Sequence, residues 1–286
     1  MTMKAGMSRV LKVLLGAVFV VSCALLLKQT LQYQQGENIY DEAVALAQLP
    51  EWTDAAPTVE EVTEELRQEK EVSAEAVTEP LPEESGQESE EVSPPEDPYA
   101  DALRDMDFTR LREVNGDVLG WILIPDTNVS YPMVQGKNND YYLRRTWDKT
   151  RNTMGSIFVD DRNGRDLRDF HTVIYGHRMR DGSMFGRLYK YEDADYWKDH
   201  PDFYLADDSG SHTYTIFSAY LADSMDTYQF EFADDGEKED FIQYCVSKSW
   251  LDTGIVPGVN DRIVTLSTCS GNGYDTRWVI HGVRTE

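Results

Sequence analysis

Cysteine is scarce in this chain, which contains only three cysteines in 286 residues. Cys23 lies inside an apolar segment, so only Cys245 and Cys269 remain for the rest of the chain, too few for a disulfide scaffold. No CxxC pair and no Cys/His cluster with zinc spacing is present, which argues against a structural metal. We therefore expect no metal site, no cofactor and no disulfide between Cys245 and Cys269.

Basic residues are also few, with 27 Lys and Arg against 52 Asp and Glu and a formal net charge of −25. Nucleic-acid binding needs clustered Lys and Arg, so the composition excludes it as the expected function. The acidity is concentrated in residues 51–98, which contain six prolines and almost no aromatic residues. Such a segment buries too little surface to offset its ordering entropy. We expect residues 28–98 to form an acidic, largely disordered stalk, although residues 29–49 have helical propensity.

Long hydrophobic runs are limited to residues 10–27, an 18-residue segment interrupted only by Lys12. This length is just sufficient to span a bilayer if Lys12 reaches the headgroups. The basic residues 1–9 would stay in the cytoplasm and the rest of the chain would lie outside. The alternatives are a cleaved secretory signal and a lipoprotein box at residues 20–23. No small-x-small cleavage site is evident, and apolar residues continue beyond Cys23, so an uncleaved single-pass anchor is favoured.

Aromatic and β-branched residues return at residue 99, where we place the start of a domain that runs to residue 286. Residues 100–113 have the apolar spacing of an amphipathic helix, and residues 235–250 form a second expected helix with an acidic start. Many short strands separated by turn residues favour a closed barrel or a sandwich. The expected strands cover residues 121–124, 129–133, 156–159, 172–175, 214–220, 263–268 and 278–283.

The most informative stretch is Ile263–Val283, in which Cys269 ends one apolar run and Arg277 opens the next. Two antiparallel strands joined by the intervening loop would bring these two side chains together at one edge of a sheet. A cation close to a thiol favours the thiolate, which is the reactive form of cysteine. Cys245 lies among apolar residues of the expected helix and is interpreted as a buried core residue.

A nucleophilic cysteine needs a partner for proton transfer. Among the five histidines, His177 directly follows the apolar run Val173–Gly176, so a rigid sheet would present it at its rim. His281 lies within the last expected strand and is interpreted as a packed or surface residue. His200 and His212 have the surroundings of loop residues. No Asp or Asn that would orient His177 can be assigned from the sequence.

Three motifs in this order resemble the sortases, the membrane-anchored cysteine transpeptidases of Gram-positive bacteria. They are YGH at residues 175–177, TLSTC at residues 265–269, and Arg277 at the start of RWVI. The N-terminal helix, the segment YPMVQGKNNDYYL and the helix before the last two strands resemble class B members. The resemblance implies a mainly β domain, an eight-stranded closed barrel with an N-terminal helix and a helix inserted before the last two strands.

By this resemblance Cys269 is the nucleophile, His177 the general acid and base, and Arg277 the group that stabilises the substrate backbone and the oxyanion. The substrate groove would involve Asn139, Leu143, Tyr228, Ser267 and Thr268. Some class B members have an acidic residue soon after the cysteine, whereas Ser270–Gly273 follows here.

The implied partners are surface proteins with a C-terminal sorting motif, NPQTN-like or PPxTG-like, and an amine of peptidoglycan. Two other functions stay open: a secreted cysteine hydrolase of the same fold, and a non-enzymatic surface module with a structural Cys269.

Overall fold

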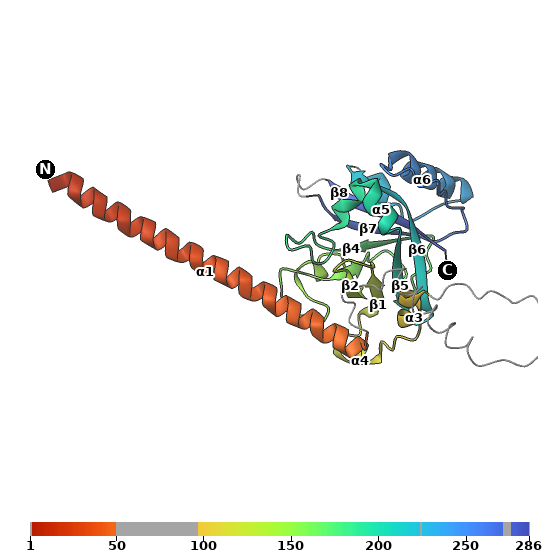
Figure 1. The fold of residues 1–286 in the computed structure, drawn as a ribbon, viewed down its shortest axis with the longest axis horizontal. Coiled ribbons are helices and arrows are strands. Elements are labelled where there is room, and N and C mark those ends of the chain that lie inside the picture. Colours follow the sequence, from red (N-terminus) through yellow and green to blue (C-terminus); the bar gives the residue numbers. More distant parts are fainter. Residues whose placement is uncertain (1, 50–96, 224, 271–275, 286) are drawn as a thin grey trace, which may run out of the picture.

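The computed structural model describes residues 2–49, 97–223, 225–270 and 276–285. Eight strands close into a barrel with the order β1-β2-β3-β4-β7-β8-β6-β5 (Figure 1). The strands are β1 (Val118–Leu123), β2 (Ser130–Val134), β3 (Ile157–Val159), β4 (His171–Tyr175), β5 (Asp202–Asp207), β6 (Gly210–Ala222), β7 (Ile263–Cys269) and β8 (Arg277–Arg284). The helices are α1 (Thr2–Ala47), α3 (Pro98–Arg104), α4 (Thr109–Val114), α5 (Ala194–Asp199) and α6 (Asp235–Lys248), with short 3-10 turns η1 (Tyr142–Arg144), η2 (Leu188–Glu192) and η3 (Met225–Tyr228).

The barrel is mixed, because β2 pairs with β3 and β4 pairs with β7 in parallel, while the other pairs are antiparallel. Its interior is filled by large apolar side chains, among them Trp121, Phe203 and Leu266, each fully buried. Closure pairs both edges of every strand, which removes the exposed sheet edges that promote aggregation. The expected closed eight-stranded barrel is therefore confirmed.

Each of the seven expected strands corresponds to a strand of the barrel, but β5 was not predicted. Its sequence, Asp202–Asp207, is short and has an acidic residue at each end, so it lacks a clear strand pattern. The barrel stabilises it from both sides, through pairing with β1 and β6. The expected helix at residues 100–113 is divided into α3, which ends at Arg104, and α4, which begins at Thr109; between them the carboxylate of Asp107 accepts a hydrogen bond from the N–H of Thr109.

Helix α1 runs without interruption from the N-terminal apolar segment to the surface of the barrel (Figure 1). Its last turns are buried against the domain, where Tyr40 and Ala43 are 5% and 0% exposed. The Tyr40 hydroxyl donates a 2.6 Å hydrogen bond to the carbonyl of Gly155. The indole of Trp147 donates to the carbonyl of Ile39 at 3.0 Å. These contacts make the end of α1 a part of the folded domain.

This arrangement differs from the expected start of the domain at residue 99. Residues 28–47, expected within the stalk, are helical, and residues 50–96 lie outside the described residues. The close approach of α1 depends on Gly36, since any larger side chain there would clash with the sulfur of Met154. The signal that was missed is the apolar spacing of Tyr40, Ala43 and Ala47, which lie on one helical face.

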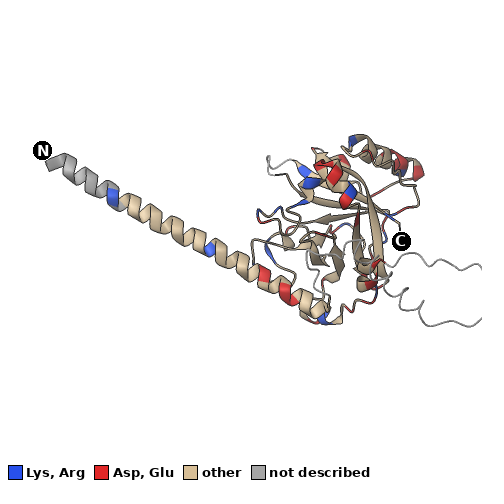
Figure 2. Cartoon of the chain, viewed as in Figure 1, with Lys and Arg blue, Asp and Glu red and all other residues tan. Residues whose placement is uncertain are grey.

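The first half of α1 projects away from the barrel (Figure 1). No charged residue lies between Lys12 and Lys28 (Figure 2), and large apolar side chains such as Phe19 and Leu26 are more than 60% exposed. A window of this helix has a mean hydropathy of 1.9 and is long and apolar enough to cross a membrane. This uncovered apolar surface is consistent with a membrane anchor.

Removing α1 is expected to destabilise the domain. A chain that starts at residue 98 loses the packing of Tyr40, Ala43 and Ala47, whereas a chain that starts at residue 30 keeps it. Burial of a large side chain contributes roughly 1.5–3 kcal/mol, so we expect a loss of about 3 kcal/mol. For a domain of this size that corresponds to a melting temperature lower by roughly 6–12 °C. Thermal unfolding of the two chains measures the difference, and equal melting temperatures would contradict the assignment of α1 to the fold.

A network of hydrogen-bonded, buried polar side chains lies across the sheet on the α6 side of the barrel. Thr265 bonds to Nε2 of His171 at 2.6 Å and to Nδ1 of His281 at 2.7 Å, and His281 also contacts Tyr220 at 3.1 Å. Burial lowers the pKa of His171 to about 4, so this ring is neutral near pH 7. His281 is therefore packed inside the sheet, one of the two positions expected for it, and does not reach the rim that carries Cys269.

Candidate active site

Cys269 and Arg277 are brought together by strand pairing. They are the last residue of β7 and the first residue of β8, and their Cα atoms are partners in the antiparallel register. Residues that face each other in an antiparallel pair direct their side chains to the same face of the sheet. Cys269 is exposed at this rim, whereas the preceding residues of β7 are buried. The antiparallel pairing of Cys269 with Arg277 at one edge of the sheet, which the sequence predicts, is therefore present.

His177 reaches the same rim from the other side of β7. Strand β4 runs parallel to β7, with Tyr175 opposite Ser267, and the N–H of Gly176 donates to the carbonyl of Ser267 at 3.1 Å. His177 follows two residues after the end of β4, and Cys269 lies two residues after Ser267 at the end of β7, so both belong to the same rim of the barrel. The three candidate catalytic residues thus belong to three adjacent strand ends, although 92 residues separate His177 from Cys269 along the chain.

The imidazole of His177 is held in a defined orientation. Its Nε2 lies 2.6 Å from the carbonyl oxygen of Leu143, which only accepts hydrogen bonds, so Nε2 carries the proton. Within the described residues Nδ1 has no hydrogen-bond partner, so it is the nitrogen left for proton transfer. Gly155, with a φ of +61°, packs against the ring, and a Cβ built there would lie 2.8 Å from Cδ2 of His177. The backbone carbonyl of Leu143 thus orients the ring, a role for which the sequence offered no Asp or Asn.

The expected groove residues are only partly brought together. The hydroxyl of Tyr228, in η3, lies 2.8 Å from that of Ser267, one residue before the buried Thr268. Ser267 is itself fully buried, so its hydroxyl positions Tyr228 rather than facing solvent. The hydroxyl of Thr268 is also buried and has no hydrogen-bond partner in the described part of the chain. Leu143 is half-buried beside His177, where its carbonyl is engaged as described above.

Asp160 links Asn139 to Tyr175 at the end of β4. The sequence analysis did not identify Asp160 as a residue of the site. One carboxylate oxygen of Asp160 accepts hydrogen bonds from Asn139 at 3.0 Å, from Tyr175 at 2.9 Å and from Arg162 at 2.8 Å. Burial alone would raise the pKa of Asp160, but the hydrogen bonds from Arg162 and Tyr175 hold it below its usual range. Its position directly after the expected strand at residues 156–159 is the signal that could have identified it, because polar residues at strand ends often support a site.

Replacing Asp160 with Asn is expected to lower the free energy of unfolding by about 3 kcal/mol, because one partner of a buried charged network is removed. The amide cannot accept all the bonds that the carboxylate accepts, so Asn139 and Tyr175 lose their common support. Chemical denaturation measures the change. Asp161→Asn, at the exposed neighbouring acid, is the matched control and should change stability by less than about 0.5 kcal/mol. An Asp160→Asn protein as stable as this control would contradict the role of Asp160.

Comparison with known proteins is consistent with this geometry. The family model described as "Sortase domain" matches residues 122–285. Sortase B of Listeria monocytogenes is 39% identical over 185 residues, covering 64% of this chain and 73% of that protein. Sortase B of Staphylococcus aureus is 33% identical over 163 residues, covering 57% of this chain and 67% of that protein.

Solved structures agree with the sequence relatives. A Staphylococcus aureus sortase B–substrate complex has a TM-score of 0.60 at 30% identity and covers 63% of this chain and 84% of that one. The sortase B of Bacillus anthracis in complex with AAEK1 has a TM-score of 0.58 at 36% identity, covering 62% and 83% of the two chains. The matched family model spans more than half of the sequence, and the barrel and the order of its motifs agree with it. The chain therefore belongs to the sortase family, cysteine transpeptidases, and within it to class B.

Proposed function

We propose that this protein cleaves the C-terminal sorting signal of secreted proteins after a Thr and joins the new carboxyl end to an amine of peptidoglycan. The observation that supports this most directly is the strand register that brings Cys269, His177 and Arg277 to one rim. The sorting signal would be NPQTN-like or PPxTG-like and would lie along the side of Leu143 and Tyr228.

In this mechanism the thiol of Cys269 gives its proton to Nδ1 of His177, and the resulting thiolate attacks the carbonyl carbon of the Thr, so that the negative charge passes to the carbonyl oxygen. The imidazolium of His177 gives this proton to the leaving amine, the peptide bond breaks, and a thioester remains on Cys269. An acceptor amine then attacks the thioester carbonyl and gives its proton to His177. The C–S bond breaks, an amide forms, and the sulfur of Cys269 takes the proton back from His177. Nδ1 takes up and releases the proton in these steps, because Nε2 is bonded to the carbonyl of Leu143.

Arg277 would stabilise the negative charge that develops on the oxyanion. Its guanidinium donates one hydrogen bond to the carbonyl of Thr276 at 3.0 Å, which helps to fix its plane. Arg277→Lys is expected to reduce kcat/KM by about 10²-fold or more, because an ammonium cannot reproduce two parallel donors and each such donor contributes roughly 3 kcal/mol. Steady-state peptide cleavage measures this, with Arg284→Lys at the other end of β8 as the control. A lysine variant with wild-type kcat/KM would assign Arg277 a structural role.

The function is tested with fluorescent peptides that contain each sorting motif, incubated with and without an amine acceptor. Amide product in the presence of the amine supports transpeptidation. Hydrolysis alone with every wall amine tried would favour the secreted hydrolase instead. Thioester formation is measured separately by mass spectrometry of the intact protein, so failure to cleave and failure to transfer are distinguished.

The third candidate, a non-enzymatic module, predicts an unreactive Cys269. The structure favours the enzyme, because Cys269 is exposed while Cys245 is fully buried. Burial raises the pKa of Cys245 to about 12, so this thiol stays protonated and unreactive near pH 7. A thiol-reactive probe should therefore label Cys269 and spare Cys245 in the folded protein.

We also propose the orientation of the chain in the membrane. The basic N-terminal residues 1–9 would be cytoplasmic and the barrel extracellular, in accordance with the positive-inside rule. Secreted substrates and lipid-linked wall precursors are both found at that outer face, so anchoring increases the effective concentration of the enzyme near them. Protease accessibility of the barrel in intact cells tests the orientation.

A further inference from the structure

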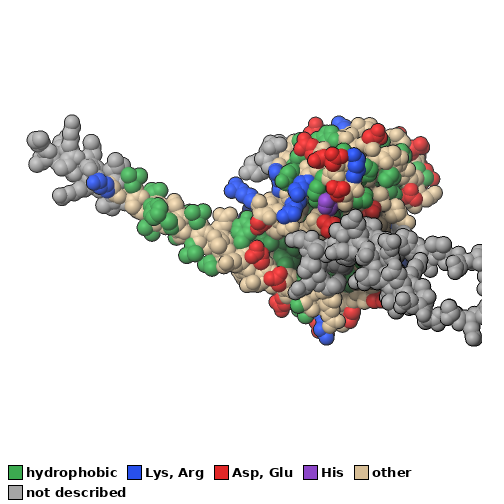
Figure 3. Space-filling view, viewed as in Figure 1, with side chains coloured by type: hydrophobic (Ala, Val, Ile, Leu, Met, Phe, Trp, Pro, Cys, Tyr) green, Lys and Arg blue, Asp and Glu red, His purple; other side chains and the backbone are tan. Residues whose placement is uncertain are grey.

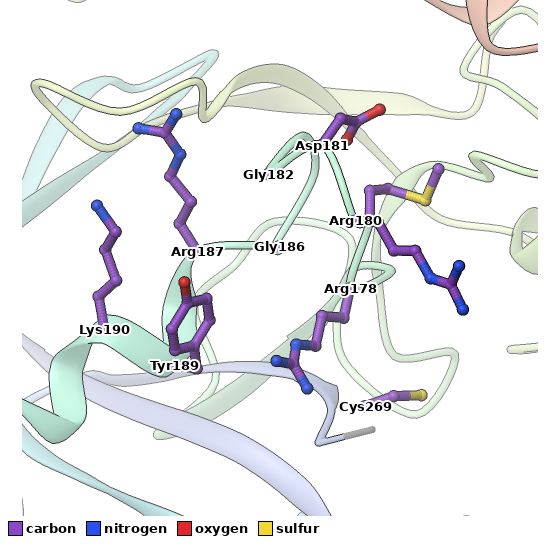
Figure 4. A pocket seen from close by; sticks show the side chains of 10 residues that line it. Arg178, Arg180, Asp181, Gly182, Gly186, Arg187, Tyr189, Lys190 and Cys269 are labelled. Carbon is purple, nitrogen blue, oxygen red and sulfur yellow. The ribbon is translucent and has the colours of Figure 1, made fainter. Parts of the chain in front are cut away.

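A cavity of ≈ 680 Å³ adjoins the candidate nucleophile (Figure 4). Its wall is formed by the loop after His177 and by η2, and Cys269 borders it at one side. Four cationic side chains and a single carboxylate, that of Asp181, line it. The cations are Arg178, Arg180, Arg187 and Lys190. In a chain with a net charge of −25, such a concentration of positive charge beside the reactive thiol is unusual.

None of these four cations forms an ion pair with a carboxylate in the part of the chain that the structure describes. Arg178 stacks on Tyr189 and donates to the carbonyl of Ser270. Lys190 lies 5.0 Å above the ring of Tyr196. Asp181 uses its carboxylate for Ser183, whose N–H and hydroxyl it accepts at 2.9 and 2.7 Å. The positive charge of the cavity is therefore not neutralised from within.

The cavity is distinct from the expected sorting-signal groove. None of the expected groove residues lines it, including Leu143 and Tyr228. The expected groove residues lie in the segments after β2 and β6 and in β7, whereas the cavity is lined by residues between 178 and 190 and by Cys269. Cys269 therefore borders a cavity that is separate from the groove expected for the acyl donor. A transpeptidase needs a second binding region, for the acceptor.

We propose that this cavity, which we call the cationic pocket, is the acceptor subsite and that it binds an anionic group carried by the amine acceptor. The anion is a carboxylate or a phosphate, since both accept hydrogen bonds from guanidinium groups. Its charge would hold the amine next to the thioester on Cys269. This inference rests on the proposed function and adds the chemical class of the acceptor.

The pocket also lies beside the part of α1 that leaves the membrane segment. Arg180 and Asp181 line a shallow cleft together with Leu26, Tyr33 and Glu37 of α1. Figure 3 shows basic side chains gathered on the side of the domain from which the free half of α1 projects. An acceptor that is lipid-linked through phosphate groups would approach from this side, which is why both sources of anion are tested.

Two matched pairs of acceptors test the proposal with the full chain in detergent. The first pair is 4-aminobutanoate and 4-aminobutanamide, which differ by the carboxylate. The second is O-phosphoethanolamine and ethanolamine, which differ by the phosphate. The anion raises the basicity of its own amine and so reduces the reactive unprotonated fraction. A preference for the anionic member therefore reports binding rather than amine chemistry. The rate of transfer is measured on the preformed thioester.

We expect the anionic member of at least one pair to react with a kcat/KM about tenfold higher, and the pair that shows this identifies the source of the anion. Arg187→Gln and Lys190→Gln should each reduce that preference by about threefold to fivefold, the size of a partly exposed charge interaction. Asp181→Asn should increase it. Arg168→Gln, an exposed arginine at the opposite end of β4, is the matched control and should leave the preference unchanged.

Equal reactivity of both members of both pairs would overturn the proposal while leaving transpeptidation intact. A preference that persists in Arg187→Gln and Lys190→Gln would also overturn it, because the selectivity would then arise elsewhere. If these two variants slow thioester formation and leave transfer unchanged, the pocket holds the leaving part of the sorting peptide and the acceptor assignment is wrong. Absence of a thioester in the wild-type protein would instead contradict the proposed function itself.

Discussion

Cys269→Ala is expected to abolish thioester formation and peptide turnover, with a loss of at least about 10⁴-fold in kcat. The reason is that no other described thiol can replace it. Cys245 is buried and its pKa is raised to about 12 by burial, so it is neither accessible nor ionised near neutral pH. Cys23 lies in the long apolar part of α1, outside the barrel that carries His177 and Arg277. Intact-mass measurement after incubation with a sorting peptide detects the acylated protein.

The control for this variant is Cys245→Ala. Cys245 lies on α6 and packs in an apolar cluster with residues such as Phe241. Removing its buried thiol should therefore lower stability but leave acylation of Cys269 intact. A Cys269→Ala protein that still forms a covalent adduct with the peptide would remove Cys269 from the role of nucleophile. If the Cys245→Ala protein folds but cannot be acylated, the assignment of Cys269 rather than Cys245 as the nucleophile would be wrong.

His177→Ala is expected to lower kcat/KM by roughly 10²- to 10⁴-fold, the usual contribution of a general acid and base. The variant loses proton transfer to the leaving amine and from the acceptor amine. Since the Nε2 bond to Leu143 fixes the ring, Nδ1 is the atom left to exchange the proton. The measurement is the rate of acylation by a sorting peptide, which should fall in the variant.

His200→Ala is the matched control, since that ring stacks on Tyr196 at 4.1 Å and bonds to a backbone carbonyl away from the rim. It should retain the wild-type rate of acylation. A second variant, Gly155→Ala, separates chemistry from positioning. An added methyl would press on the His177 ring and the Leu143 carbonyl, so kcat should fall while His177 stays present. Full activity of His177→Ala would require a different base.

The three candidate catalytic residues could be predicted from the sequence because each has a local signal. Cys269 and Arg277 flank one short loop, so their meeting needs only an antiparallel pair. His177 ends a buried strand, and strand ends present side chains at a rim. What could not be read locally was the parallel pairing of β4 with β7, a contact between segments far apart in the chain that only barrel closure decides.

The residues that support the site were harder to predict, because their roles depend on backbone atoms and tertiary contacts. The carbonyl of Leu143 orients His177, and no side-chain pattern reports a backbone acceptor. Thr268 was expected in the groove, yet its side chain is buried, since alternation along β7 turns it opposite to Cys269. The cations of the cationic pocket are dispersed over residues 178–190, and their convergence required the fold of that loop.

The continuity of α1 has a consequence for how the enzyme tolerates changes in length. With the apolar half of α1 in a bilayer, as proposed above, the height of the Cys269 thiol above the lipid surface would be set by the helical rise of about 1.5 Å per residue, because one continuous helix runs to the barrel. Residues 50–96 follow the point at which α1 already contacts the barrel through Tyr40. Insertions or deletions among them would leave that height unchanged, whereas adding a few residues between Leu27 and Tyr40 would lift the thiol and rotate it about the rod.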